Sequence, residues 1–116
     1  MRRHEIARFE RAGDVRTVGT VERLDGSLEV REDVSGPSAL IAYGDRIHGL
    51  RMTLSVTEQE KLTKLLVETG RASLEDCLAN EEFALIDLMD LCDAGGISYS
   101  FVGLGDRSGV QFRPAF

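Results

Sequence analysis

The stretch between Leu50 and Val56 alternates strictly between apolar and polar residues, and it constrains the fold more than any other part of this 116-residue chain. Leu50, Met52, Leu54 and Val56 fall on one side of an extended backbone, and the residues between them fall on the other side. This period of two predicts a half-buried strand. We expect a central strand over residues 47–56.

A helix is expected directly after this strand. Thr57 and Glu60 have the S/T-x-x-E spacing of a capping box, in which each side chain binds a backbone N–H group that the first helical turn leaves without a partner. Gly70 suits the end of a helix, because glycine readily adopts the left-handed conformation found there. The sequence therefore predicts a helix over residues 57–69.

Two more helical segments are expected before the C-terminal region. Ser73 and Asn80 are N-cap residue types, and they predict helices over residues 73–79 and 81–94. In the longer segment, apolar residues recur at positions i, i+3, i+4 and i+7, as on the buried side of a helix. Gly95-Gly96 is expected to end it.

Residues 15–34 are expected to form a hairpin that turns at Asp25-Gly26. Two registers are open, one pairing Val21 with Val30, the other pairing Leu24 with Leu28 and Arg23 with Glu29. We favour the second register, because it places opposite charges directly across the two strands.

The two ends of the chain are expected to add further strands. Ile6 and Phe9 are three residues apart, which suits a helical turn, but residues 1–12 also suit an edge strand, which we favour. Residues 97–113 read as a second hairpin with a glycine-rich loop at residues 103–109. The stretch from Ala39 to Tyr43 is interpreted as a short apolar link.

This order of strands, helices and strands predicts an α+β fold with a small antiparallel sheet. The sheet would comprise the N-terminal hairpin, the central strand 47–56 and the C-terminal hairpin 97–113, with two or three helices packed on one face. The absence of repeats and of Pro/Ser-rich linkers indicates that residues 1–116 form a single domain.

Negative charge is concentrated in one part of the chain. The net charge is −6, yet the segment from Ala72 to Asp106 has eight acidic residues and no lysine or arginine. Residues 1–31 hold seven arginines against six acids and are nearly balanced. An acidic segment of this size repels the phosphates of nucleic acid, so direct nucleic-acid binding is not expected.

The same segment contains the residues that we expect to contact a partner, namely Glu81, Glu82, Asp87, Asp90 and Asp93. Asp87, Asp90 and Asp93 recur every three residues. Asp90 and Asp93 lie near the predicted helix C-terminus, where a negative charge costs about 0.3–1 kcal/mol. This placement favours a non-catalytic inhibitor, immunity or regulatory protein that binds a basic protein such as a toxin, a nuclease or another nucleic-acid-binding protein, although solubility alone also explains such a surface.

A second hypothesis concerns small ligands. The loop at residues 103–109 has glycines and polar groups of the kind that cradle phosphate, and His48 is in phase with the apolar side of the central strand. The residues expected to line this alternative site are His48, Gly103, Gly105, Arg107 and Ser108. The loop lacks both common phosphate-binding spacings, and nothing marks a catalytic nucleophile, so we expect no enzyme activity.

Neither a metal ion nor a cofactor is expected, because no ligand spacing is present. Cys77 and Cys92 fall among apolar residues of the predicted helices and are expected to be reduced thiols.

No apolar stretch is long enough to span a membrane, and no apolar segment follows the basic N-terminus, so a cytoplasmic location is expected. An exposed edge strand could also support a homodimer, and an uncharacterised oligomerising domain is the third hypothesis.

Overall fold

The computed structural model describes the backbone of residues 1–105 and 109–113 and the side chains of residues 1–105. It contains a six-stranded antiparallel sheet in which each strand pairs with the next one along the chain. The strands are β1 (Arg2–Arg11), β2 (Asp14–Glu22), β3 (Leu28–Ser35), β4 (Ile47–Leu54), β5 (Ser100–Gly105) and β6 (Gly109–Arg113), and the helices are α1 (Pro37–Tyr43), α2 (Val56–Glu68), α3 (Leu74–Leu78) and α4 (Leu85–Ala94). The predicted α+β class is confirmed.

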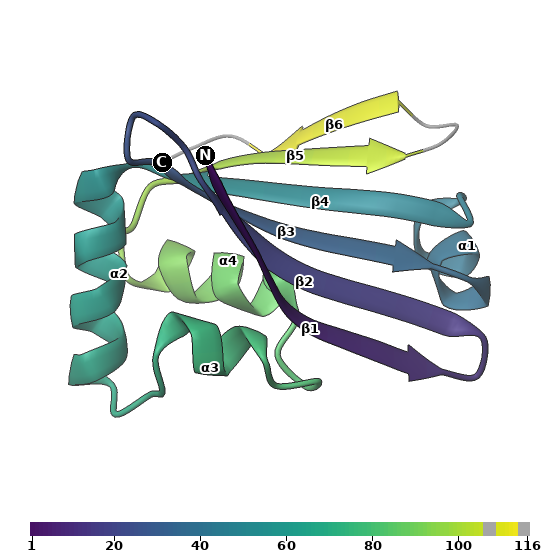
Figure 1. Cartoon of the computed structure of the whole chain (residues 1–116), viewed down its shortest axis with the longest axis horizontal. Helices are drawn as coiled ribbons and strands as arrows, with labels where there is room; N and C mark the ends of the chain where they lie inside the picture. The colour runs from purple at the N-terminus through teal and green to yellow at the C-terminus, as the bar shows by residue number, and fades with distance from the viewer. Residues whose placement is uncertain (106–108, 114–116) are drawn as a thin grey trace.

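The helices α2, α3 and α4 lie together against one face of the sheet, and α1 lies at the opposite end (Figure 1). The core between these layers contains Leu50, Met52 and Leu54 from β4, together with apolar residues of all three helices. Met52 and Leu54 have no exposed surface. The alternation of β4 therefore identifies the buried face of the sheet correctly up to Leu54.

The predicted central strand is two residues too long. Ser55 has an extended backbone and is the N-cap of α2, with its hydroxyl accepting a hydrogen bond from Glu58 N at 3.3 Å. Val56 is thus the first residue of the helix and is 49% exposed. The expected Thr57–Glu60 capping box is wrong, because the sequence offers the same spacing two residues earlier at Ser55 and Glu58.

The preferred register of the first hairpin is also wrong. The ladder pairs Glu22 with Leu28 and Val21 with Glu29, a register that differs from both alternatives. Asp25 accepts hydrogen bonds from the backbone and hydroxyl of Ser27, and this local turn widens the loop. The expected ion pair between Arg23 and Glu29 nevertheless forms, on a diagonal of the ladder.

Two helical predictions require correction. The stretch interpreted as an apolar link is helix α1, which Pro37 begins and Gly44 ends with a φ of 78°. The helix predicted over residues 81–94 begins only at Leu85. Asn80 instead closes a turn, its side-chain oxygen accepting a hydrogen bond from Glu82 N at 2.9 Å.

The N-terminal stretch is a strand, as favoured, and it forms one edge of the sheet. A bulge interrupts its pairing with β2 between Glu5 and Ala7. Bulges and charged side chains protect edge strands from pairing with other chains. Homodimerisation through this edge stays a prediction, and the bulge weighs against it.

Candidate functional site

Most acidic residues of the sheet strands form ion pairs with arginines. Their ion pairs are Arg2–Glu22, Arg8–Glu10, Arg16–Glu32, Arg23–Glu29, Arg31–Glu29 and Arg51–Asp33. Apart from Arg23, which follows β2, each arginine lies on the same strand as its acid or on the neighbouring strand. The near balance of arginines and acids in residues 1–31 thus corresponds largely to ion pairs between residues that lie close together.

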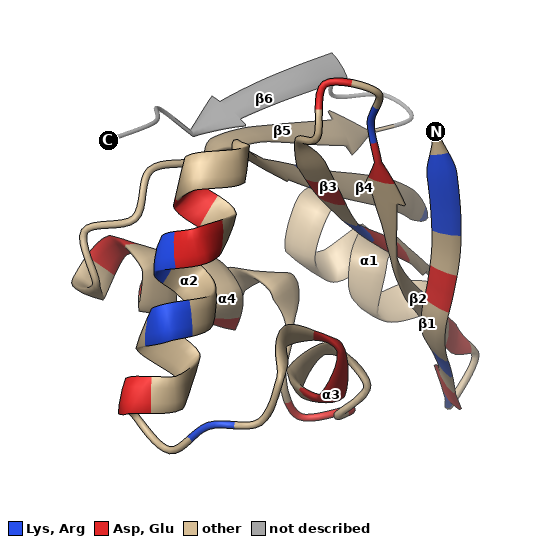
Figure 2. Ribbon diagram, turned by 60° about the vertical axis from the view of Figure 1, so that its left-hand side comes forward, with Lys and Arg blue, Asp and Glu red and all other residues tan. Residues whose placement is uncertain are grey.

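The acidic residues around α3 and α4 are different. Six of them are exposed, and we call them the acidic surface: Glu75, Asp76, Glu81, Glu82, Asp87 and Asp90. Neither α3 nor α4 has a basic residue (Figure 2). Glu81 of this set pairs with Arg11, with 3.7 Å between Arg11 Nη2 and Glu81 Oε1.

Two of the predicted contact residues have structural roles. Asp87 lies in the first turn of α4, where its carboxylate accepts a hydrogen bond from Ala84 N at 2.8 Å and faces the positive end of the helix dipole. Asp93 is half-buried and accepts a hydrogen bond from the Tyr99 hydroxyl at 2.7 Å. These contacts explain the presence of both aspartates without requiring a protein partner. The Tyr99 hydroxyl thus offsets part of the cost expected for Asp93 near the helix C-terminus.

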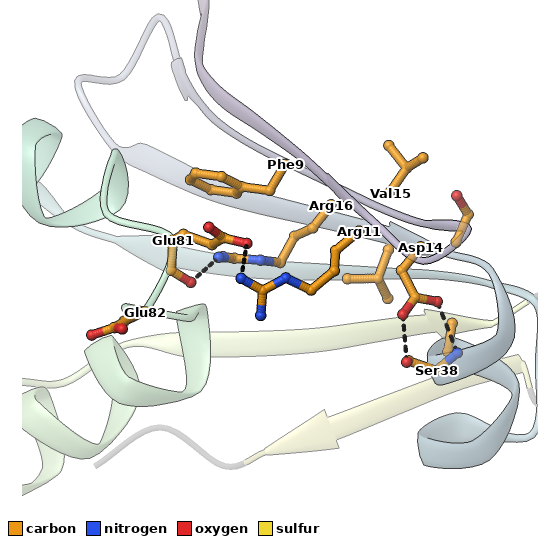
Figure 3. Close-up of a pocket in the computed structure, with 11 residues that line it drawn as sticks. Phe9, Arg11, Asp14, Val15, Arg16, Ser38, Glu81 and Glu82 are labelled. Atoms are coloured by element: carbon orange, nitrogen blue, oxygen red, sulfur yellow. Dashed lines mark hydrogen bonds and ion pairs between the residues drawn. The ribbon is translucent and has the colours of Figure 1, made fainter.

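A pocket of about 350 Å³ lies where the acidic surface meets the sheet. The strands β1, β2 and β3 line its floor, α1 forms one side, and the turn before α4 forms the other side (Figure 3). Its lining residues are Phe9, Arg11, Asp14, Val15, Arg16, Val34, Ser35, Ser38, Ala39, Glu81 and Glu82. Of the predicted contact residues, Glu81 and Glu82 thus lie at this pocket.

A buried ion pair supports the pocket floor. Arg16 Nη1 lies 3.2 Å from Glu32 Oε2, and the same carboxylate oxygen accepts a hydrogen bond from Leu85 N at 2.9 Å. The Arg16 guanidinium also donates to the Glu81 carbonyl and stacks 4.6 Å from the centre of the Phe9 ring. Glu32 is 4% exposed. It therefore connects the sheet to the N-terminus of α4.

Sequence reasoning missed Glu32, although a signal was present. Val30, Glu32 and Val34 alternate along β3, so Glu32 belongs to the side of the strand that faces the core. A carboxylate on that side needs a positive partner, because an unpaired buried charge is costly. Arg16 is such a partner on the neighbouring strand β2.

The pocket mouth contains a carboxylate that is held in place. Asp14 accepts hydrogen bonds from the hydroxyl and the backbone N–H of Ser38 at the start of α1. These bonds lower the pKa of Asp14 below its ordinary value, so its side chain is negatively charged at neutral pH. Glu82 lies exposed at the opposite side of the mouth (Figure 3).

Only part of the alternative ligand site falls within the described residues. The ladder pairs His48 with Gly105, and Gly103 lies on the same strand, while Arg107 and Ser108 lie outside the described residues. His48 is 1% exposed, and its ring stacks on Tyr43 with centroids 3.9 Å apart. Nδ1 of His48 has no hydrogen-bond partner within the described part of the chain. A ligand would have to displace covering groups to reach this ring.

The burial of His48 predicts a pH dependence of stability. Burial lowers the pKa of His48 below its ordinary value, while the nearby Asp45 carboxylate opposes this effect. The unfolded chain therefore binds a proton more readily than the folded chain, and stability is lost as the pH falls below about 6.5. We expect Tm to decrease between about pH 7.5 and 5.5, and His48→Gln to flatten that decrease.

His4 provides the control for this prediction, because it is exposed on the edge strand β1. His4→Gln should leave the pH profile of Tm unchanged. Differential scanning calorimetry of both variants measures the profile directly. Parallel profiles for His48→Gln and the unmodified chain would show that the burial of His48 does not govern this transition.

Within the described residues, no three His, Cys, Asp or Glu side chains are grouped as a metal site would require. Cys77 and Cys92 are both free, as expected, and burial raises the pKa of the Cys92 thiol to about 12. No helix in the described part of the chain is long and apolar enough to cross a membrane.

No protein-family model, curated protein or solved structure matches this chain. The acidic surface and the pocket beside it are therefore the features that bear on its function.

Proposed function

We propose that this domain is a non-catalytic binding protein that engages a basic protein partner through the acidic surface. An inhibitor, an immunity protein or a regulatory protein acts in this way. The supporting observation is the contrast in charge pairing. Five of the seven acids on the strands pair with an arginine, whereas no lysine or arginine exists between Ala72 and Asp106.

Electrostatics explains why such a contrast suits binding. An excess of like charge on one side of a protein produces a field that accelerates association with an oppositely charged surface and disfavours like-charged partners. Nucleases and other nucleic-acid-binding proteins have basic surfaces, because they bind phosphates. A partner from this class would complement the acidic surface.

The test compares two doubly neutralised variants with the same change in net charge. Glu75→Gln/Asp76→Asn removes two charges from the acidic surface, and Glu60→Gln/Glu68→Gln removes two exposed charges from α2. Asp87 and Asp93 are avoided, because their structural roles would confuse the result. A basic partner recovered at low salt and identified by mass spectrometry is then purified, and its association rate is measured.

We expect the α3 variant to associate about threefold to tenfold more slowly at low salt, with a weaker salt dependence, and the α2 variant to stay close to the unmodified chain. Circular dichroism is used to check that both variants are folded. Equal association rates for the two variants at every salt concentration would contradict the proposal.

The ligand-binding hypothesis, with His48, Gly103, Gly105, Arg107 and Ser108, stays a prediction. Its one structural support is the pairing of His48 with Gly105.

A further inference from the structure

We propose that the pocket between the sheet, α1 and the turn before α4 takes the guanidinium group of an arginine side chain supplied by the basic partner. This inference rests on the proposed function and specifies where the partner inserts. The pocket is a cavity with defined walls, whereas the acidic surface alone has no cavity for an inserted side chain.

The shape of the pocket fits a long side chain with a polar head. Its volume of about 350 Å³ is near the lower end of ligand pockets, which span roughly 300–1,000 Å³. Phe9, Val15, Val34 and Ala39 provide apolar surface for a methylene stem. Arginine buries its stem against such surface while its charged head stays near water.

The charges of the pocket favour a cation. Arg16 is matched by Glu32, and Arg11 is close to Glu81, so neither guanidinium leaves an excess of positive charge. Asp14 and Glu82 remain at the mouth (Figure 3), and Glu82 forms no ion pair with any described residue. An anion would meet these carboxylates and be repelled.

The planar shape of guanidinium favours arginine over lysine. Its donors form a fork that matches a carboxylate at two points, whereas an ammonium group acts as a point charge. The pocket already holds two such groups of its own, because Arg11 extends toward the Glu81 carboxylate and Arg16 donates to the Glu81 carbonyl (Figure 3). Arg11 is 82% exposed along its side chain, so a partner's arginine can approach Glu81 and Glu82 without breaking a buried contact.

The test uses a small probe and does not require the partner. N-acetyl-L-arginine amide is titrated into the ¹⁵N-labelled chain, with the lysine and citrulline analogues in parallel. We expect saturable amide shifts at Phe9, Arg11, Ser38 and Glu82, with a Kd in the millimolar range for so small a ligand. Glu82→Gln should weaken binding at least about fivefold, because it removes a charged acceptor, and Glu75→Gln should not change it.

Two results would overturn the inference. One is the absence of saturable shifts at the pocket with the arginine probe. The other is equal binding of the citrulline or lysine analogue, since recognition would then depend on size or on charge alone.

Failure of this inference is distinguishable from failure of the proposed function. If the arginine probe does not bind while Glu75→Gln/Asp76→Asn slows partner association, the pocket inference fails and the proposed function stands. If the probe binds but that variant associates normally, the proposed function fails and the pocket remains a site for guanidinium.

Discussion

Replacement of Glu32 by alanine is expected to lower the free energy of unfolding by about 3–5 kcal/mol, because it leaves the largely buried Arg16 without its carboxylate. The same change removes the acceptor of Leu85 N at the start of α4. Both groups are mostly shielded from water, so water compensates little for the lost partner. Urea denaturation followed by circular dichroism measures the effect.

Asp33→Ala is the matched control, since Asp33 is the next residue on β3 and also pairs with an arginine. Its carboxylate binds Arg51 on the other face of the sheet, but its side chain is 47% exposed. An exposed ion pair contributes about 0–1 kcal/mol. If Glu32→Ala and Asp33→Ala destabilised the chain equally, the connection between the sheet and α4 would not contribute as described.

The second large effect is expected at Leu54. This side chain is fully buried at the end of β4, and truncation to alanine should cost about 2–5 kcal/mol through lost burial and an unfilled cavity. The midpoint of urea unfolding should fall accordingly.

Val56→Ala distinguishes the observed end of the strand from the expected one. Strict alternation would bury Val56 beside Leu54, whereas the structure places it 49% exposed at the first position of α2. Alanine there should change stability by no more than about 0.5 kcal/mol, as for other surface positions. A loss comparable to that of Leu54→Ala would mean that the strand continues through Val56.

The sequence predicted the sheet well where one signal dominated. The alternation in β4 requires one buried face, and a shift of a single residue would expose that whole face. The helices were predicted from their periodicity, but their ends were less certain. Ser55 and Thr57 both begin an S/T-x-x-E spacing, and only the point at which β4 leaves the sheet selects Ser55.

The first hairpin shows why the register was not predictable from pairing energies. The expected attraction between Arg23 and Glu29 is present, yet long side chains can meet diagonally as well as directly across a ladder. The hydrogen bonds from Ser27 to Asp25 set the loop instead. The register expected from charge would have placed Leu24 in the ladder, but Leu24 is 92% exposed at the loop.

The sequence located the acidic segment of the candidate site, but it did not predict the roles of the individual acidic residues. Asp87 was expected in the middle of a helix, and it became a first-turn acceptor because α4 begins at Leu85. Asp93 meets Tyr99 only after the chain turns back at Gly95-Gly96. These contacts depend on where a helix ends and what lies beside it.

By itself, the sequence determined the α+β class, the buried face of β4 and the absence of basic residues between Ala72 and Asp106, because periodicity and charge are local properties of the chain. Tertiary structure alone decided the pocket and the ion pair beneath it. Phe9, Arg16, Ser38 and Glu81 come from four separate segments, and their juxtaposition follows from strand pairing and from the helices that pack on the sheet. The spacing of these residues along the chain does not predict that arrangement.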